Sequence, residues 1–209
     1  HYPLRRQRQM CIRDSLTTVA YKLNNEFNYA LEGSIYSCGN IIQWLRDKMQ
    51  FFENAKDSEL LLDSKGNSNN VHFLPAFNGL GAPYWNSDVR AGFYGMTQNT
   101  SKKDLVTAAF KSICYQTKDI ISILKINELE INNLLVDGGM TSNLTFCQIL
   151  SDSINVNVLK PSNIESTALG ACIAAQIGNG ISMDSLNTKL DKEYICLLYT
   201  SPSPRDVEE

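Results

Sequence analysis

The sequence predicts an α/β domain. Runs rich in β-branched and aromatic residues alternate with longer segments in which apolar residues recur every three or four positions, a pattern typical of strands followed by helices. Glycines stand at two of these strand-to-helix junctions: Gly39 where a helix is expected to begin, and Gly139 in the turn that precedes the next helix. With 209 residues, 43% of them hydrophobic, the chain can bury a core of its own.

The first half of the chain predicts a hairpin that leads into a helix. Residues 16–23 favour a strand, the Asn24–Asn25 pair favours a turn, and residues 27–36 favour the returning strand. Gly39 then opens a helix whose apolar face carries Ile42, Leu45 and Met49. A short helix at 57–66 and a strand at 71–77, which ends in a glycine-rich loop, are expected next.

The second half predicts a long helix followed by alternating strands and helices. Ser101 and Asp104 have the spacing of a capping box, with Asp where Glu or Gln is usual, so a helix is expected from there to about Ile126. A strand at 134–136, a glycine turn at 137–139, a helix at 143–154, a strand at 156–159 and a helix at 165–177 complete the series.

Composition and cysteine usage narrow the class of protein. The formal net charge is −3, and no apolar run approaches the roughly 20 residues that span a bilayer. The six cysteines are scattered without a Cys-x-x-Cys pair, and the only histidines are His1 and His72. We therefore expect a cytoplasmic protein with reduced thiols, no metal-ligand set and no membrane partner.

Both termini differ from the rest of the sequence. Residues 5–14 (RRQRQMCIRD) cluster four arginines without periodicity, and their codons resemble a transposase-type sequencing adapter. Residues 196–206 (CLLYTSPSPRD) resemble the same adapter read on the opposite strand. We expect disordered tails at 1–15 and 196–209 that make no contacts with a domain at 16–195. Without the tails the domain is mildly acidic, which argues against nucleic acid as a partner.

Three segments are candidates for a ligand site. Gly39 and Gln43 stand four residues apart and so share one side of a helix, and Gly139 and Asn143 flank the second glycine junction. Glycine lets a ligand approach the backbone, and amides at a helix start favour phosphates. Residues 75–85 form an aromatic, glycine-rich loop that could line a cleft. Taken alone, each segment is explained at least as well by a purely structural role: a tight turn, a surface glutamine or a loop anchored by burial.

The order of these segments resembles that of the FGGY family of carbohydrate kinases. The resemblance rests on residues 29–35 (YALEGSI), 42–47 (IQWLRD), 78–85 (NGLGAPYW), 91–96 (AGFYGM), 115–117 (YQT), 136–139 (VDGG) and 167–171 (TALGA). The form of the loop at 78–85 is similar to that of the members that phosphorylate glycerol. Lys111 departs from the family pattern, which usually has an acidic or amide residue there.

The resemblance implies an actin-like, ribonuclease H-like C-terminal domain that forms one wall of a cleft and binds ATP or ADP. The reaction would transfer the γ-phosphate of MgATP to glycerol and give glycerol 3-phosphate, in a homo-oligomeric full-length enzyme. Gly39, Gln43, Gly139 and Asn143 match the family's nucleotide contacts. The catalytic base, the glycerol contacts and the first phosphate loop would lie upstream of Leu16, so no catalytic residue is assigned and the chain alone should be inactive. Another polyol or sugar kinase of the family, or a non-catalytic actin-like nucleotide-binding module, remain as alternatives.

Overall fold

The computed structural model describes residues 16–23, 25–63, 67–126, 130–161, 166–181 and 192–194. Helices and strands alternate in it, as an α/β domain requires. The chain divides into two compact units, His1–Glu130 and Ile131–Glu209, which are taken in turn below. The two predicted tails lie outside the described residues, so their expected lack of contacts stays a prediction.

The first unit opens with the predicted hairpin. Strand β1 (Leu16–Leu23) pairs with β2 (Glu26–Glu32) in antiparallel register, with an irregularity between Val19 and Tyr21. The returning strand ends at Glu32 and not at Tyr36, so the predicted range was too long. The backbone after Glu32 is drawn into the body of the unit, because the carbonyl of Ser34 accepts a hydrogen bond from the N–H of Ala82 at 2.9 Å.

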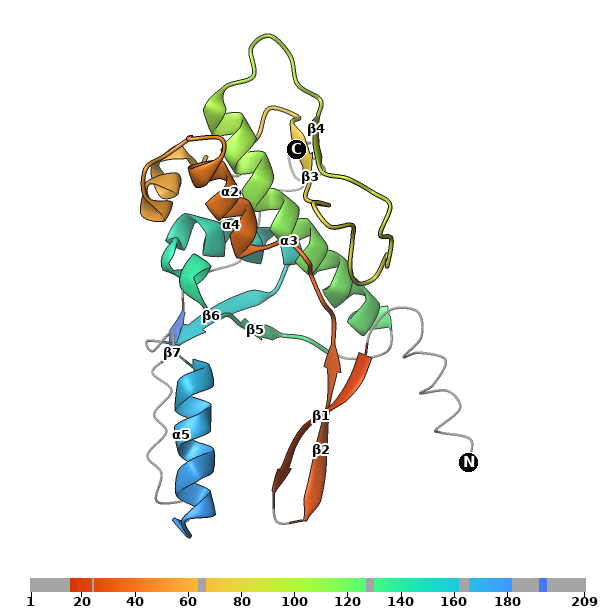
Figure 1. Cartoon of the computed structure of the whole chain (residues 1–209), viewed down its shortest axis with the longest axis vertical. Helices are drawn as coiled ribbons and strands as arrows, with labels where there is room; N and C mark the ends of the chain where they lie inside the picture. The colour runs from red at the N-terminus through yellow and green to blue at the C-terminus, as the bar shows by residue number, and fades with distance from the viewer. Residues whose placement is uncertain are drawn as a thin grey trace, which may run out of the picture. The chain divides into compact units, whose positions relative to one another are not determined.

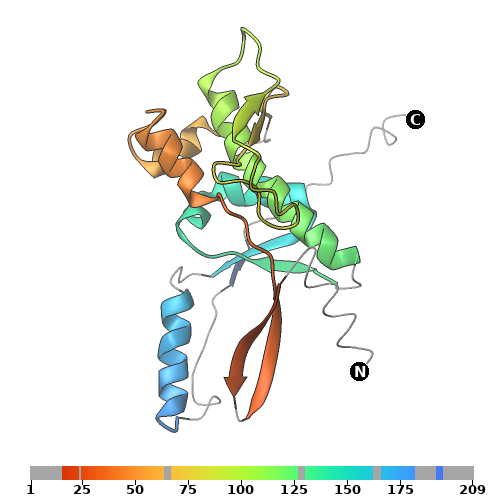
Figure 2. The same cartoon turned by 45° about the vertical axis from the view of Figure 1, so that its right-hand side comes forward.

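The hairpin projects away from helices α2 and α3 (Figures 1 and 2). Its described side chains from Thr17 to Glu32 are exposed, apart from the half-buried Ala30. They include large apolar groups such as Tyr29, which is 68% exposed. A two-stranded hairpin is marginal in water by itself, so we expect further protein to cover this one.

Helix α2 (Gly39–Asp47) buries the face that the sequence predicted, with Ile42 and Leu45 in the core. Met49 was also expected on this face, but the helix ends two residues before it and its side chain is 40% exposed. A 3-10 helix, η1 (Ala55–Leu61), follows in place of the predicted short helix at 57–66. It begins earlier than expected because the carboxylate of Asp57 accepts the N–H of Asn54 at 3.0 Å and so caps the turn.

Helix α3 (Lys102–Ile126) is the long helix of this unit and carries much of its core. The predicted capping box is confirmed: the N–H of Ser101 donates to Asp104 Oδ2 at 2.8 Å, and the N–H of Asp104 donates to Ser101 Oγ at 3.3 Å. The shorter Asp therefore serves where Glu or Gln is usual. Most of the first four turns are buried, including Val106, Ala109, Phe110, Ile113 and Gln116.

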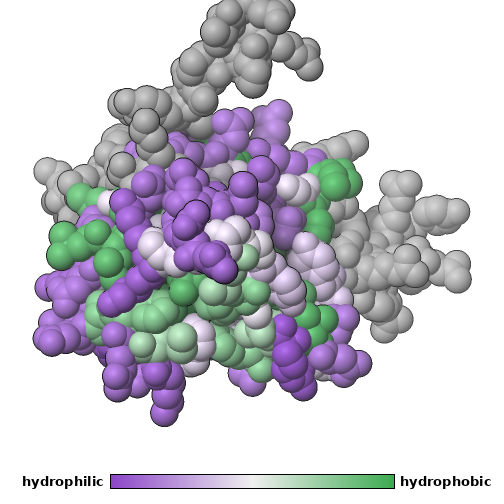
Figure 3. Space-filling model, turned by 90° about the horizontal axis from the view of Figure 1, so that it is seen from above, coloured by the Kyte–Doolittle hydropathy of each residue, from purple (hydrophilic) through white to green (hydrophobic). Residues whose placement is uncertain are grey.

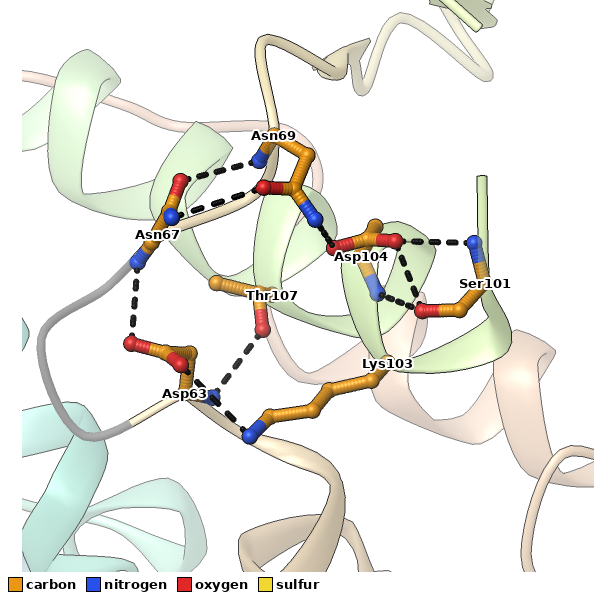
Figure 4. Close-up of polar contacts among 7 residues, drawn as sticks. All are labelled: Asp63, Asn67, Asn69, Ser101, Lys103, Asp104 and Thr107. Atoms are coloured by element: carbon orange, nitrogen blue, oxygen red, sulfur yellow. Dashed lines mark hydrogen bonds and ion pairs between the residues drawn. The ribbon is translucent and has the colours of Figure 1, made fainter. Parts of the chain in front are cut away.

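A polar network joins the start of α3 to the loop that precedes β3 (Figure 4). Asp104 is only 4% exposed, and its Oδ1 accepts the side-chain N–H of Asn69 at 2.7 Å. The N–H of Asp63 donates to Thr107 Oγ1 at 3.2 Å, and Lys103 pairs with Asp63 at 3.5 Å. The Asp104 carboxylate thus stabilises a helix start and a loop at once.

Replacing Asp104 with Ala should lower the free energy of unfolding by about 2–3 kcal/mol, because a cap and hydrogen bonds to a charged group are lost. Hydrogen bonds hold the pKa of Asp104 below its usual range, and the bond from the Ser101 hydroxyl contributes most. A depressed folded-state pKa means that this stability is present above the unfolded value of about 3.9 and is lost as the pH falls through the folded value. Urea unfolding at pH 7 and pH 3 measures both effects. A change under about 0.5 kcal/mol at pH 7, the range of ordinary surface substitutions, would contradict this account.

Strands β3 (His72–Leu74) and β4 (Gly92–Tyr94) form an antiparallel pair that brackets the aromatic loop. The strand was predicted to run to Phe77 but ends at Leu74, since the chain turns there into the loop. Aromatic rings hold the pair to α2: Trp44 stacks on Phe73 at 6.1 Å, and Phe73 lies 4.4 Å from Phe93 between ring centres.

The second unit is a three-stranded sheet with helices, in the order β5 (Asn133–Leu135), β6 (Asn157–Pro161) and β7 (Lys192–Tyr194). Strands β5 and β6 are parallel, and β7 is antiparallel to β6. Between β5 and β6 lie η2 (Gly139–Ser142) and α4 (Leu144–Ile154). The predicted strands and the α4 helix are confirmed to within two residues at each end, whereas β7 was not predicted.

Helix α5 (Ser166–Gly178) extends from this sheet (Figures 1 and 2) and has no buried residue. It is rich in small and apolar side chains, so its exposure leaves an apolar surface uncovered. Within the described residues, no helix is long and apolar enough to cross a membrane.

Candidate functional site

The first predicted pair lies at the start of α2. Gly39 is the first residue of the helix, and Gln43 follows one turn later with an exposed side chain. The chain enters through Cys38, whose N–H donates to Asn40 Oδ1 at 2.8 Å and whose carbonyl accepts the N–H of Ile41 at 3.0 Å. The helix start is therefore well defined, and Gln43 can reach a ligand beside it.

The second pair lies where β5 gives way to α4. The ladder extends one residue past β5, because the N–H of Val136 donates to the carbonyl of Leu159 at 2.9 Å. The chain then turns at Gly138, whose φ of 93° suits glycine. Asn143 begins α4 as its N-cap, since its Oδ1 accepts the N–H of Phe146 at 2.8 Å.

This capping bond leaves the other end of the Asn143 amide to bind something else. The side chain is half-buried, and its Nδ2 is a buried donor without a hydrogen-bond partner among the described residues. Buried donors are almost always satisfied in folded proteins. The cap fixes which way the amide faces, and Nδ2 has almost no exposed surface of its own.

The glycines of the two pairs have no structural reason within the described chain. Neither Gly39 nor Gly139 has a positive φ, and a Cβ added to either would meet nothing within 4 Å. The space beside these two glycines is therefore open to a ligand that approaches the backbone. Gly170 and Gly178 on the exposed helix α5 have equally open surroundings, so open space alone does not identify a ligand contact.

The aromatic loop behaves differently. A Cβ on Gly81 would collide with the carbonyl of Ser34, and Gly79 has a φ of 84°, so packing and backbone geometry account for both glycines. The hydroxyl of Tyr84 donates to Asp119 on α3 at 2.8 Å, which raises the pKa of Tyr84. The structure thus supports the anchored-loop reading of this segment, and we assign it no ligand.

Asp137 belongs to the turn of the second junction and was not predicted to be a catalytic base. Its Oδ1 accepts the N–H of Gly138 at 2.6 Å, and its Oδ2 accepts the hydroxyl of Ser166 at the start of α5. These bonds hold the pKa of the Asp137 carboxyl below its usual range, and the bond from the Ser166 hydroxyl contributes most. The carboxylate is ionised at neutral pH and already engaged, which suits it poorly for accepting a proton from a substrate.

Other surface features carry less chemistry. An open hollow of about 600 Å³ lies beyond the C-terminal end of α2, where Arg46 and Asp47 pair with each other at 2.6 Å. It contains none of the four predicted site residues. Lys111, which departs from the family pattern, places its Nζ 5.6 Å from the ring centre of Tyr115. Across the described ranges, no group of three or more His, Cys, Asp or Glu could hold a metal ion.

An α/β domain with glycines at a helix start and at a strand-to-helix turn is compatible with the class of proteins that bind phosphate-containing ligands. Comparison with known proteins identifies the family. The model of the C-terminal domain of the FGGY family of carbohydrate kinases matches residues 8–178, and the chain belongs to this family. The predicted actin-like α/β fold is confirmed by solved structures of the same family.

The relatives are glycerol kinases. The chain is 44% identical over 181 residues to the glycerol kinase of Marinomonas sp. (strain MWYL1), an alignment that covers 85% of this chain and 37% of that protein. A glycerol kinase of Coxiella burnetii is 43% identical over 171 residues, covering 82% of this chain and 34% of the relative. The chain thus spans little more than a third of the length of these relatives.

Solved structures of FGGY carbohydrate kinases are also similar to this chain. Plasmodium falciparum glycerol kinase with ADP superimposes with a TM-score of 0.77 at 34% identity, covering 88% of this chain and 38% of that one. Xylulose kinase from Lactobacillus acidophilus, with a TM-score of 0.67 at 23% identity over 82% of this chain and 34% of that one, shows the shared fold alone. The family match begins at residue 8, inside the segment assigned to a tail. The domain limits at 16 and 195 stay predictions.

Proposed function

We propose that this chain is the nucleotide-binding wall of an ATP-dependent glycerol kinase, which transfers the γ-phosphate of ATP to glycerol. The observation that carries the proposal is that Gly39 and Gly139 lie at helix starts, with open space where a side chain would be and no backbone need for glycine. A glycerol kinase solved with ADP is similar to 88% of the chain, and this favours a nucleotide as the occupant of that space.

The chemistry of the four residues suits a nucleotide. Backbone N–H groups at the starts of α2 and η2 favour negative or electron-rich groups. Gln43 is exposed one turn into α2 and can both donate and accept a hydrogen bond. Asn143 can only donate further, because its Oδ1 is used by the cap. We propose that Asn143 lies beside the bound nucleotide at the turn that contains Gly139.

The remaining parts of the reaction are assigned to sequence that this chain does not contain. Phosphoryl transfer needs a base for the hydroxyl proton and a cation to neutralise charge on the phosphates. Asp137 is engaged in hydrogen bonds to its own turn, and the part of the chain that the structure describes offers no ligand set for Mg²⁺. We therefore derive no step through Mg²⁺ and no proton transfer within this chain. We propose that the full-length enzyme to which this chain belongs is a homo-oligomer located in the cytoplasm.

Uncovered apolar surface supports the idea that more protein belongs here. The hairpin exposes Val19, Phe27 and Tyr29 by half or more of their surface, and α5 buries nothing. Figure 3 shows further hydrophobic areas bordered by hydrophilic residues on one face of the molecule. In relatives more than twice as long, the additional chain is the natural cover for such surfaces.

The test is a substrate panel on a chimera in which the upstream part of the Marinomonas glycerol kinase precedes Leu16. We expect ATP-dependent phosphorylation of glycerol to exceed that of xylulose and gluconate by at least about a hundredfold, because a site built to hydrogen-bond one polyol discriminates strongly. In the chimera the substrate contacts come from the Marinomonas part. The full-length enzyme to which this chain belongs should therefore be assayed as well, and we expect it to show the same order of substrates. If that full-length enzyme prefers a sugar, the proposed substrate is wrong, whereas the proposed nucleotide-binding role of this chain is unaffected.

Gln43→Ala should weaken ATP binding by about fivefold, on the order of 1 kcal/mol, if it removes one hydrogen bond to the nucleotide. The side chain is exposed, so stability should not change. The Michaelis constant for ATP in the chimera measures the effect. Gln176→Ala, an exposed glutamine on α5, is the matched control. Equal constants for both variants would remove Gln43 from the site.

A further inference from the structure

The turn after β5 contains a carboxylate that the proposed function does not use. Asp137 accepts a hydrogen bond from the N–H of Gly138 at 2.6 Å, and a second one from the hydroxyl of Ser166, 29 positions later in the chain. The N–H of Ser166 also bonds to this carboxylate. One side chain therefore joins the glycine turn to the first residue of α5.

Each of these bonds restrains a part of the chain that few other contacts hold. Gly138 has a φ of 93° and no neighbour within 4 Å of where its Cβ would be, and on its other side its carbonyl accepts the N–H and the hydroxyl of Thr141 at 3.0 and 2.8 Å. Helix α5 buries no residue, so packing does not fix its start either. A carboxylate at the first turn of a helix satisfies its open N–H groups and interacts favourably with the helix dipole.

We propose that Asp137 is a positioning residue for the nucleotide. It clamps the Gly138 turn to the start of α5 and thereby holds the Gly139 amide and the Asn143 side chain in the arrangement that binds. The inference rests on the proposed function, since it assigns Asp137 to the same site. Asp137 itself does not touch the nucleotide and takes no proton.

The size of the effect follows from the fraction of molecules with the turn in its binding form. Apparent affinity falls by the factor by which that fraction falls. Removing the carboxylate leaves the N–H of Gly138 without its acceptor and frees the start of α5. The turn then keeps only the bonds from Thr141 to the Gly138 carbonyl, so its glycines sample more conformations. We expect the Asp137→Ala variant to bind ADP at least about tenfold more weakly, with helix content unchanged.

The experiment titrates a fluorescent ADP analogue into the purified 209-residue chain, which contains both predicted pairs. Four variants are compared with the original chain: Asp137→Ala, Asp137→Asn, Ser166→Ala and the double change of Asp137 and Ser166 to Ala. Asn keeps an oxygen acceptor, so it should restore most of the affinity. Ser166→Ala should weaken binding by about two- to threefold, as the loss of one of several hydrogen bonds. Because both residues act through one clamp, the double variant should bind no more weakly than Asp137→Ala.

The outcomes separate this inference from the proposal it rests on. If the original chain binds ADP and Asp137→Ala binds equally well, even with a lowered melting temperature, Asp137 is structural only and the inference fails alone. If the original chain binds no ADP, the nucleotide wall and the clamp fail together. Additive losses in the double variant would also overturn the clamp. If Asp137→Ala does not fold, the ADP affinities of the Asp137→Asn and Ser166→Ala variants test the clamp, because each of these variants keeps part of the hydrogen bonding. Affinities equal to that of the original chain in both variants would then overturn it.

Discussion

The purified chain alone should form glycerol 3-phosphate at least about 10⁴-fold more slowly than a chimera that carries the upstream part of a relative. A positioned base contributes roughly 10²–10⁴-fold to such a rate, and charge stabilisation by donors or a cation contributes a further 10²–10³-fold. Neither is assigned to this chain, whose relatives are more than twice as long. A coupled assay for ADP, with ATP and glycerol supplied, measures the difference.

Two controls make this result interpretable. The chain should still bind ADP, which shows that inactivity does not come from unfolding. The upstream part of the relative, expressed without the chain, should be inactive as well, because it lacks this nucleotide wall. Turnover by the isolated chain at a rate near that of the chimera would place a base and a phosphate site within the 209 residues and contradict the account.

Gly139→Val should raise the Michaelis constant for ATP in the chimera by about 10- to 100-fold and leave that for glycerol nearly unchanged. The valine side chain would occupy the space through which the nucleotide reaches the backbone, and losing one hydrogen bond to a charged group costs about 1.5–3 kcal/mol. The glycerol contacts are assigned to the upstream part. Steady-state kinetics with each substrate varied in turn separates the two constants.

The open surroundings of Gly139 make this substitution a clean one. A Cβ there meets nothing within 4 Å, and φ lies outside the left-handed region, so the fold should tolerate valine. Gly178→Val is the matched control: Gly178 has equally open space but ends α5. If both variants raise the constant for ATP equally, or if Gly139→Val raises the constant for glycerol instead, Gly139 is not a nucleotide contact.

Local chemistry explains which parts of the fold could be predicted. The start of α3 was predictable because Ser101 and Asp104 satisfy each other over three residues, and the start of α4 because Asn143 caps its own helix. Both need only neighbouring residues. By contrast, Met49 was misplaced because α2 ends at Asp47, and the second strand of the hairpin was drawn too long because Ala82, far along the chain, bonds to Ser34.

The candidate site was predictable only in part. Spacing placed Gly39 with Gln43, and Gly139 with Asn143, but it left a structural role equally open for each pair. The structure adds the empty space beside both glycines and the unpaired Nδ2 of Asn143. The bond from Ser166 to Asp137 was not predictable from sequence, because it joins residues 29 positions apart. The short polar strand β7 has no apolar alternation that would reveal it.

The central claim is that the backbone at Gly39 and the backbone at Gly139 each contact a nucleotide. Amide NMR spectra of the isotope-labelled chain during an ADP titration test it most directly, because the signals of Gly39 and Gly139 report on the two positions separately. The account predicts that each signal moves as ADP is added and reaches saturation. A signal that does not move at saturating ADP would contradict the assignment of that glycine to a nucleotide contact.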